Sequence, residues 1–235
     1  MKINYIKSFV LITALNMSVN NIAQANPLDA MPKNNQENPQ QLTDAKSILM
    51  TKLAHLDHFS ANFNQEVLSD SGEMLEQSSG KLAISKPNLA NWHTIEPDEL
   101  AIVSDGQDVW FYNPWIDQVS VYSLSAAIAK TPILLLTSKD EALWQQYTVT
   151  RKAVTQSQDS FVISAKDMNS QIKSLTLIFD PDEKGGELKQ FSFLDATGQI
   201  SHIKLNNFDN KKTLELSLFN FVVPEGVQVD DQRAN

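Results

Sequence analysis

The sequence predicts a mainly β protein, an incomplete antiparallel β-barrel of about eleven strands with short α-helices covering its concave hydrophobic face. After residue 59, apolar and polar side chains alternate with period two in most segments. Turn sequences such as Asp105-Gly106 separate these segments and are typical of β-hairpins. The alternation is interrupted once, by a helical stretch over residues 125–146, "SAAIAKTPILLLTSKDEALWQQ".

The first 25 residues have the features of a cleaved export signal. Lys2 and Lys7 accompany the apolar run "SFVLITALNMSV", which is too short to span a bilayer, and "AQA" fits cleavage after Ala25. Losing these lysines lowers the formal net charge from −9 to −11. Residues 26–42 are rich in Asn, Gln and Pro, so we expect a flexible extension. Residues 43–235 are expected to form a single domain.

Two helical regions are expected in that domain. "TDAKSILMTKLAHLDHF" places apolar residues at helical spacing, with Thr43 as its N-cap. In the second region, Thr131-Pro132 is typical of a helix start. The following "PILLL" is apolar on every side, which is unusual for a surface helix. Ser138 and Glu141 have the spacing of a capping box.

The strands are expected on both sides of the second helical region. Early segments include "FSANFNQEVL", "SSGKLAISKP" and "NLANWHTIEP", and late segments run from "YTVTRKAV" to "KTLELSLFNFVVP". Alternation places Trp110 and Tyr112 on one face of a strand and Val109 and Phe111 on the other. The sequence does not indicate which face is concave. Trp115 lies in a turn, where we expect it near a rim.

Composition argues against several functional classes. An acidic chain without a run of Lys or Arg is a poor candidate for nucleic-acid binding. The absence of Cys excludes a thiol nucleophile, Cys-ligated zinc and a lipidated N-terminal Cys. No phosphate-binding loop, nucleophile elbow or dinucleotide fingerprint occurs. We therefore predict no enzymatic activity, no catalytic residue, no cofactor and no metal.

The remaining polar clusters are weak candidates for sites. His55 and His58 could seed a metal site, but no third ligand is fixed, and a solvated helix face is the simpler interpretation. Residues 96–99, "EPDE", offer neighbouring carboxylates that are more typical of a solvated turn. A sugar platform built on Trp110 and Trp115 stays open as an alternative, although hydrolysis would require two facing carboxylates.

The apolar features favour lipid binding. Aromatic strands usually form plain core, but here a large curved sheet is combined with a helix that is apolar on every side. An apolar sheet face beneath such a helix would form a pocket for acyl chains.

From about residue 43 to 233 the chain resembles the LolA family of periplasmic lipoprotein carriers. The resemblance rests on an ordered set of segments: "FSANFNQ", "SSGKLAISKPNLANWHTIEPDE", "IVSDGQDVWFYNPWIDQV", "TPILLL", "WQQY" and "PEGVQVDDQR". It implies an incomplete β-barrel with a helical lid over a hydrophobic cavity. It also implies a monomer of the periplasm that accepts acylated lipoproteins from the inner-membrane LolCDE complex and passes them to the outer-membrane receptor LolB.

On this basis the candidate acyl-chain residues are apolar positions on the strands and the "PILLL" helix. They are Phe63, Leu82, Ile84, Trp92, Ile102, Trp110, Tyr112, Val121, Leu134, Leu135, Phe179, Phe191 and Phe193. The family often has Arg where this chain has Lys86, which makes Lys86 the candidate lid latch with a less specific donor geometry. Ala90 stands where an aromatic residue is frequent. The alternative function is binding of another lipid or a glycolipid on the same fold.

Overall fold

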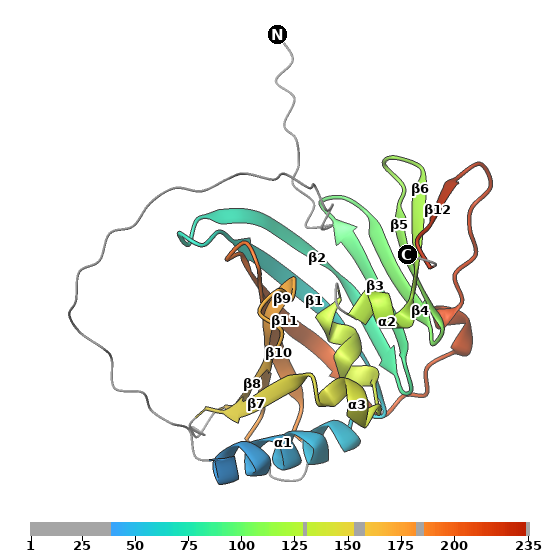
Figure 1. Cartoon of the computed structure of the whole chain (residues 1–235). Helices are drawn as coiled ribbons and strands as arrows, with labels where there is room; N and C mark the ends of the chain where they lie inside the picture. The colour runs from blue at the N-terminus through green and yellow to red at the C-terminus, as the bar shows by residue number, and fades with distance from the viewer. Residues whose placement is uncertain (1–38, 129–130, 153–157, 182–185, 234–235) are drawn as a thin grey trace, which may run out of the picture. The chain divides into compact units, whose positions relative to one another are not determined.

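The computed structural model describes residues 39–128, 131–152, 158–181 and 186–233 (Figure 1). The expected signal peptide, and the expected extension up to residue 38, lie outside the described residues. The helices are α1 (Pro39–Ala54), α2 (Leu124–Ile128), η1 (Pro132–Thr137), α3 (Glu141–Trp144) and η2 (Leu216–Phe219), of which η1 and η2 are 3-10 helices. The strands are β1 (His58–Leu68), β2 (Met74–Ser85), β3 (Leu89–Glu96), β4 (Leu100–Asp105), β5 (Asp108–Asn113), β6 (Gln118–Ser123), β7 (Tyr147–Arg151), β8 (Asp159–Ala165), β9 (Ile172–Phe179), β10 (Leu188–Asp195), β11 (Ile200–Asp209) and β12 (Gln228–Asp231).

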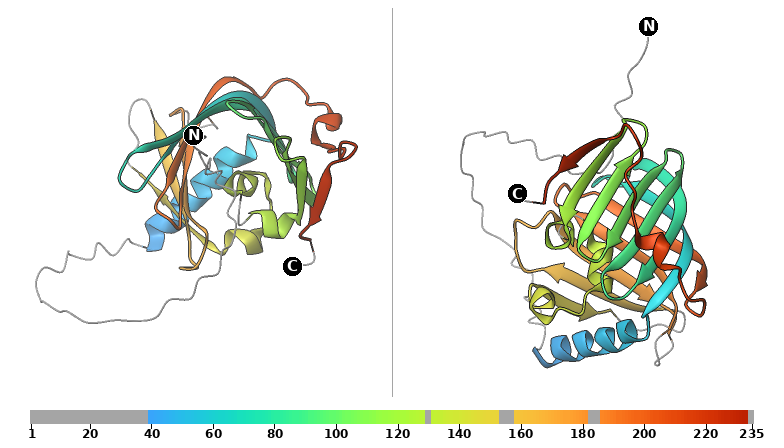
Figure 2. Two further views of the ribbon diagram at one scale, coloured as in Figure 1. Left: turned by 90° about the horizontal axis from the view of Figure 1, so that it is seen from above. Right: turned by 90° about the vertical axis from the view of Figure 1, so that its right-hand side faces the viewer.

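All the described strands belong to one open sheet in the order β12-β6-β5-β4-β3-β2-β1-β11-β10-β9-β8-β7. Neighbouring strands are antiparallel except β12, which runs parallel to β6. The predicted fold class is therefore confirmed, with twelve strands in place of about eleven. The sheet curves strongly, and α2 lies within its curve when the molecule is viewed from above (Figure 2).

Period-two patterning produces the curved sheet because one face of each strand is buried. In β1, Phe59, Ala61 and Phe63 are buried, and the intervening residues are more exposed. A close approach between β2 and β3 depends on Gly80. A Cβ atom at this position would lie only 2.0 Å from the carbonyl oxygen of His93, so any other residue would push the strands apart.

The helices follow the predicted apolar positions but not all of the predicted caps. α1 buries Leu49 and Leu53, and Leu56 just after the helix is buried too. The helix begins at Pro39, so the expected N-cap at Thr43 is wrong. The second helical region contains α2, η1 and α3, and Thr131 and Pro132 begin η1 as expected.

The predicted capping box of Ser138 and Glu141 is also wrong. Asp140 is the N-cap of α3, and its Oδ1 accepts a hydrogen bond from the backbone N–H of Ala142 at 2.8 Å. The Ser138 hydroxyl instead accepts from the backbone N–H of Asp140 at 3.1 Å.

The C-terminal segment differs most from the sequence prediction. "KTLELSLFNFVVP" was expected to be a strand, but it contains η2 and otherwise lacks strand structure. This segment crosses the outer face of β3 and β4, where the Asn91 side chain donates to the Leu218 carbonyl at 2.6 Å. The tail then adds β12 beside β6. The segment is held by contacts with the sheet, which a local alternation pattern does not reveal.

Candidate functional site

The inner face of the sheet carries a continuous row of apolar side chains. Ala61, Leu82, Trp92, Ile102 and Phe111 occupy paired positions on five successive strands. All except Ile102 are buried, and Ile102 packs against the same cluster. This row forms the floor of the candidate site.

Aromatic rings connect this floor to the other half of the sheet. The Phe63 and Trp92 ring centroids are 4.2 Å apart, and Trp92 meets Phe191 edge-on at 6.0 Å. Trp92 also donates through Nε1 to the Thr94 hydroxyl at 3.1 Å, which satisfies its polar atom inside the cluster. The two halves of the sheet therefore share one core.

Most of the predicted acyl-chain residues lie in this cluster. The buried members are Phe63, Leu82, Ile84, Trp92, Leu134, Leu135, Phe179 and Phe191, and the partly buried ones are Ile102 and Phe193.

Three predicted residues, Trp110, Tyr112 and Val121, lie elsewhere. Both rings pack against Phe221 of the C-terminal segment at 5.7 Å between centroids. Val121 pairs directly with Trp110 and is fully buried, but it is not part of the central cluster. Their assignment to the inner face is therefore corrected: they lie on the outer face of the sheet, where Phe221 of the tail packs on β5.

The inner positions of β5 belong instead to Val109 and Phe111. The alternation had separated these two residues from Trp110 and Tyr112, but it did not indicate which pair faces inward. On the late strands, Phe161 and Leu177 are cluster residues that the candidate list lacked. Alternation in "SFVISAK" and "IKSLTLIFD" was the available signal for both.

The helices fill the concave side with their own apolar residues. The η1 residues Ile133–Leu136 are only 1–4% exposed, and η1 contacts both α2 and β3. Within η1, the Thr137 hydroxyl donates to the Leu134 carbonyl at 2.7 Å. A short 3-10 helix has poorer hydrogen-bond geometry than an α-helix, so η1 is held mainly by side-chain burial.

The turn between β2 and β3 contacts both α1 and η1. Lys86 donates from Nζ to the Leu53 carbonyl in the last turn of α1. The backbone N–H of Asn88 donates to the Thr137 carbonyl at the end of η1, at 3.4 Å. Burial lowers the pKa of Lys86 below its ordinary value; Asp57 opposes this change and Lys139 adds to it.

A buried ionic cluster, which the sequence analysis missed, joins α1 to β8. Lys52 and Asp159 are 1% and 2% exposed, and their charged atoms are 3.2 Å apart. Asp159 also accepts two hydrogen bonds from the Arg151 guanidinium, at 2.8 and 3.0 Å. In the sequence, Lys52 occurs at helical spacing among the apolar residues Leu49, Leu53 and Leu56. A charge at such a position was the signal that Lys52 needs a partner.

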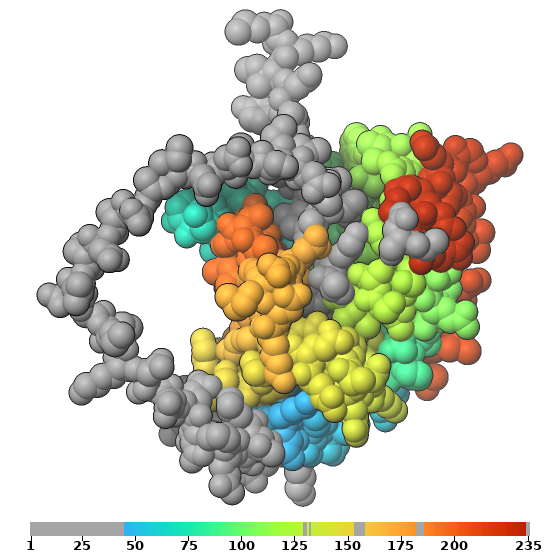
Figure 3. Space-filling view, in the orientation of Figure 1, coloured from blue at the N-terminus to red at the C-terminus, as the bar shows by residue number. Residues whose placement is uncertain are grey.

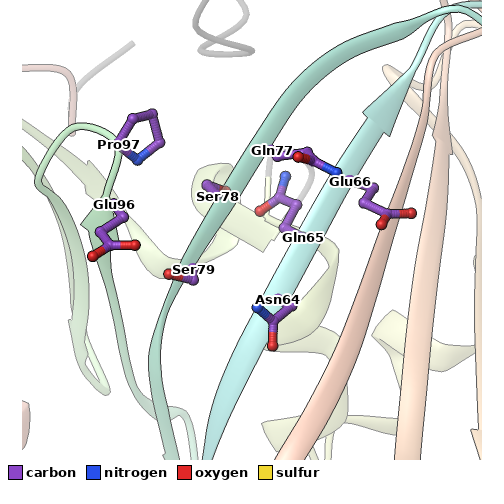
Figure 4. A pocket seen from close by; sticks show the side chains of 8 residues that line it. All are labelled: Asn64, Gln65, Glu66, Gln77, Ser78, Ser79, Glu96 and Pro97. Atoms are coloured by element: carbon purple, nitrogen blue, oxygen red, sulfur yellow. The ribbon is translucent and has the colours of Figure 1, made fainter.

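A separate cavity of about 440 Å³ is lined mostly by residues with polar side chains (Figure 4). It is lined by Asn64, Gln65, Glu66, Gln77, Ser78, Ser79, Glu96 and Pro97. Asn64 and Glu66 alternate with the buried Phe63 and Val67, so their side chains lie on the outer face of β1. This cavity therefore does not belong to the apolar cluster.

The described residues contain no group of three or more His, Cys, Asp or Glu side chains that could hold a metal ion. His55 is exposed, and its Nδ1 lies 2.8 Å from the Thr51 carbonyl. Among the described helices, none is long and apolar enough to cross a membrane.

Comparison with known proteins gives consistent results. The sequence model of the family described as outer membrane lipoprotein carrier protein LolA matches residues 54–222. An outer-membrane lipoprotein carrier protein of Haemophilus influenzae is 43% identical over 192 residues, covering 82% of this chain and 89% of the relative. The corresponding protein of Aeromonas salmonicida is 37% identical over 190 residues, covering 81% and 90%.

Among solved structures, an uncharacterized conserved protein from Thermus thermophilus has the same fold, with a TM-score of 0.52. It is 14% identical and the match covers 80% of this chain and 99% of that protein.

Proposed function

This chain belongs to the LolA family of outer membrane lipoprotein carrier proteins, and on that premise we propose that it carries acylated lipoproteins through the periplasm. The acyl chains would occupy the inner face of the sheet. The observation that carries this proposal is the buried apolar cluster, which extends across both halves of the sheet and is covered by short helices.

Cargo entry requires the helical cover to move, because η1 and α2 place their own side chains on the inner face. The four apolar side chains of η1 stabilise its closed position by roughly 6–12 kcal/mol, at about 1.5–3 kcal/mol each. Three acyl chains of about fifteen carbons represent on the order of 35 kcal/mol of transfer, at about 0.8 kcal/mol per CH₂. Compared with acyl chains in water, replacing η1 on the sheet therefore gives a net gain, which keeps cargo bound once it has left the membrane. Chains drawn from a bilayer are already out of water, so that gain does not offset the displacement of η1 during loading.

The turn between β2 and β3 acts as the latch of this cover: Lys86 anchors α1, which stays in place, and Asn88 holds η1, which moves. The ammonium group holds α1 through the Leu53 carbonyl, while the backbone of Asn88 holds η1 through the Thr137 carbonyl. Displacing η1 breaks the second contact and leaves the first in place. α1 is fixed further by the Lys52–Asp159 pair, so η1 and α2 are the parts that move.

The partners follow from the same role. Loading acyl chains from a bilayer into a soluble protein requires an energy source, and we assign that role to the ATP-driven LolCDE complex of the inner membrane. Delivery is assigned to the receptor LolB at the outer membrane. The carrier itself performs no catalysis in this scheme.

The proposal is tested by incubating the purified mature protein with spheroplasts that contain a labelled lipoprotein. We expect lipoprotein in the supernatant as a soluble complex with the carrier. Matched variants place a charge at half-buried positions on the two faces of the sheet. Ile102→Glu on the inner face should abolish release, and Tyr112→Glu on the outer face should reduce it far less. Recovery of a different lipid or a glycolipid, with no lipoprotein, would support the alternative ligand class.

A further inference from the structure

The turn between β5 and β6 exposes two large apolar side chains side by side in the sequence. Trp115 is 70% exposed and Ile116 is 63% exposed. By contrast, Trp92 and Trp144 are buried and Trp110 is half-buried. Exposing an indole next to a branched aliphatic side chain leaves a considerable apolar area in water, and such patches commonly mark interaction sites.

This turn is fixed in its conformation before any partner binds. The Asn113 side chain accepts a hydrogen bond from the backbone N–H of Trp115 at 3.0 Å. Asp117 adopts a positive φ of 49°, and its carbonyl accepts from the backbone N–H of Gln228 at 2.9 Å, which ties the turn to β12. A fixed turn loses little conformational entropy on binding.

The surroundings of the two side chains are acidic. Residues 113–118 and the adjoining residues 224–228 contain no Lys, Arg or His. They contain Asp117 and Glu225, both exposed. The two segments lie next to each other at the top of the molecule, where green meets red (Figure 3). The apolar pair is therefore flanked by negative charge.

We propose that Trp115 and Ile116 form a docking knob for a protein partner whose surface has an apolar pocket with a basic rim. The inference rests on the proposed function, since the partner is the protein that supplies or receives the cargo. Tryptophan is enriched among the residues that dominate binding energy in interfaces. The flanking carboxylates would steer a basic surface into place.

The same charges argue against two other occupants. An anionic lipid surface repels Asp117 and Glu225, and the whole chain carries a formal net charge of −9. A second copy of this chain would bring the same acidic segments together, which is unfavourable for self-association through the knob.

The test measures the affinity of the mature protein for two purified probes, LolB and detergent-solubilised LolCDE from the same organism. For at least one probe, Trp115→Ser should raise Kd about tenfold or more, and Trp115→Phe should recover part of the loss. Asp117→Asn with Glu225→Gln should lower the association rate and flatten its salt dependence, since Asn tolerates positive φ. Met168→Ala, which removes an 84% exposed side chain from another turn, is the control and should leave Kd unchanged.

Cargo loading is measured separately on the same variants with spheroplasts. The docking knob is supported if Trp115→Ser loses affinity for a probe but still loads cargo normally, or still retains cargo once it is loaded. Native affinity of Trp115→Ser for both probes overturns it, as does a native protein that binds neither. Binding of the native protein to anionic vesicles that is lost in Trp115→Ser would also overturn it, because the occupant would then be a membrane. Absence of any lipoprotein complex with the native protein refutes the carrier function instead.

Discussion

Replacing Asp159 with Asn should destabilise the fold by about 3 kcal/mol, because it removes the carboxylate that faces two cations. Lys52 is 1% exposed and lies 3.2 Å from that carboxylate, so its ammonium group would stay buried without the opposing charge. Removing one partner of a buried pair costs about 3–5 kcal/mol. The Arg151 side chain is 31% exposed, so water screens its share of the cost and the lower end of that range applies.

Chemical denaturation of the mature protein measures this loss directly. Lys52→Met is the matched comparison: it keeps the two Arg151 hydrogen bonds to Asp159 and should cost clearly less than Asp159→Asn. Combining Lys52→Met with Asp159→Leu should recover most of the loss, since apolar residues of similar volume often replace a buried ion pair without penalty. A loss below about 1 kcal/mol for Asp159→Asn, or an equal loss for Lys52→Met, would show that the uncompensated Lys52 charge does not dominate the cost.

Lys86→Met should increase amide hydrogen exchange in the last turn of α1 about tenfold, because the charged donor to the Leu53 carbonyl is lost, and Lys86→Arg should not. Unchanged exchange in Lys86→Met would exclude the anchoring of α1 by this side chain. Burial lowers the pKa of Lys86, so between that lowered value and 10.5 the unfolded chain binds more protons than the folded one. As pH rises through this window, the native protein should therefore gain stability relative to Lys86→Met. A constant difference in unfolding free energy between the two proteins would contradict this expectation. Gly80→Ala should cost about 3 kcal/mol or more, because its Cβ would meet the His93 carbonyl oxygen, and near-native thermal stability would count against that clash. Phe221→Ala should loosen the tail, with faster proteolysis after residue 210 at nearly unchanged core stability; equal cleavage rates would rule out this anchoring role.

The alternation of apolar residues was sufficient to predict the sheet and which residues of a strand share a face. It separated Val109 and Phe111 from Trp110 and Tyr112, but it did not identify the concave side. Both faces of β5 are apolar because helices cover one and the C-terminal tail covers the other. A strand buried on both sides gives the same pattern whichever face lines the cavity.

The tail and the ionic cluster were harder to predict from the sequence, for a different reason. The segment around η2 alternates like a strand, yet it is held by contacts such as the Asn91 hydrogen bond rather than by a ladder. Lys52 was visible as a charge within an apolar stripe. Its partner Asp159 is far away in the sequence, and only the pairing of β7 with β8 and the packing of α1 against β7 bring the two together.

Site-specific photo-crosslinking distinguishes acyl chains bound on the inner face of the sheet from acyl chains bound elsewhere. A photoreactive amino acid is placed at Ile102 on the inner face or at Tyr112 on the outer face, both half-buried on neighbouring strands. With a labelled lipoprotein as cargo, we predict crosslinks to the acylated portion from position 102 and not from position 112. Crosslinks from position 112 with none from position 102 would show that the acyl chains do not bind the inner face.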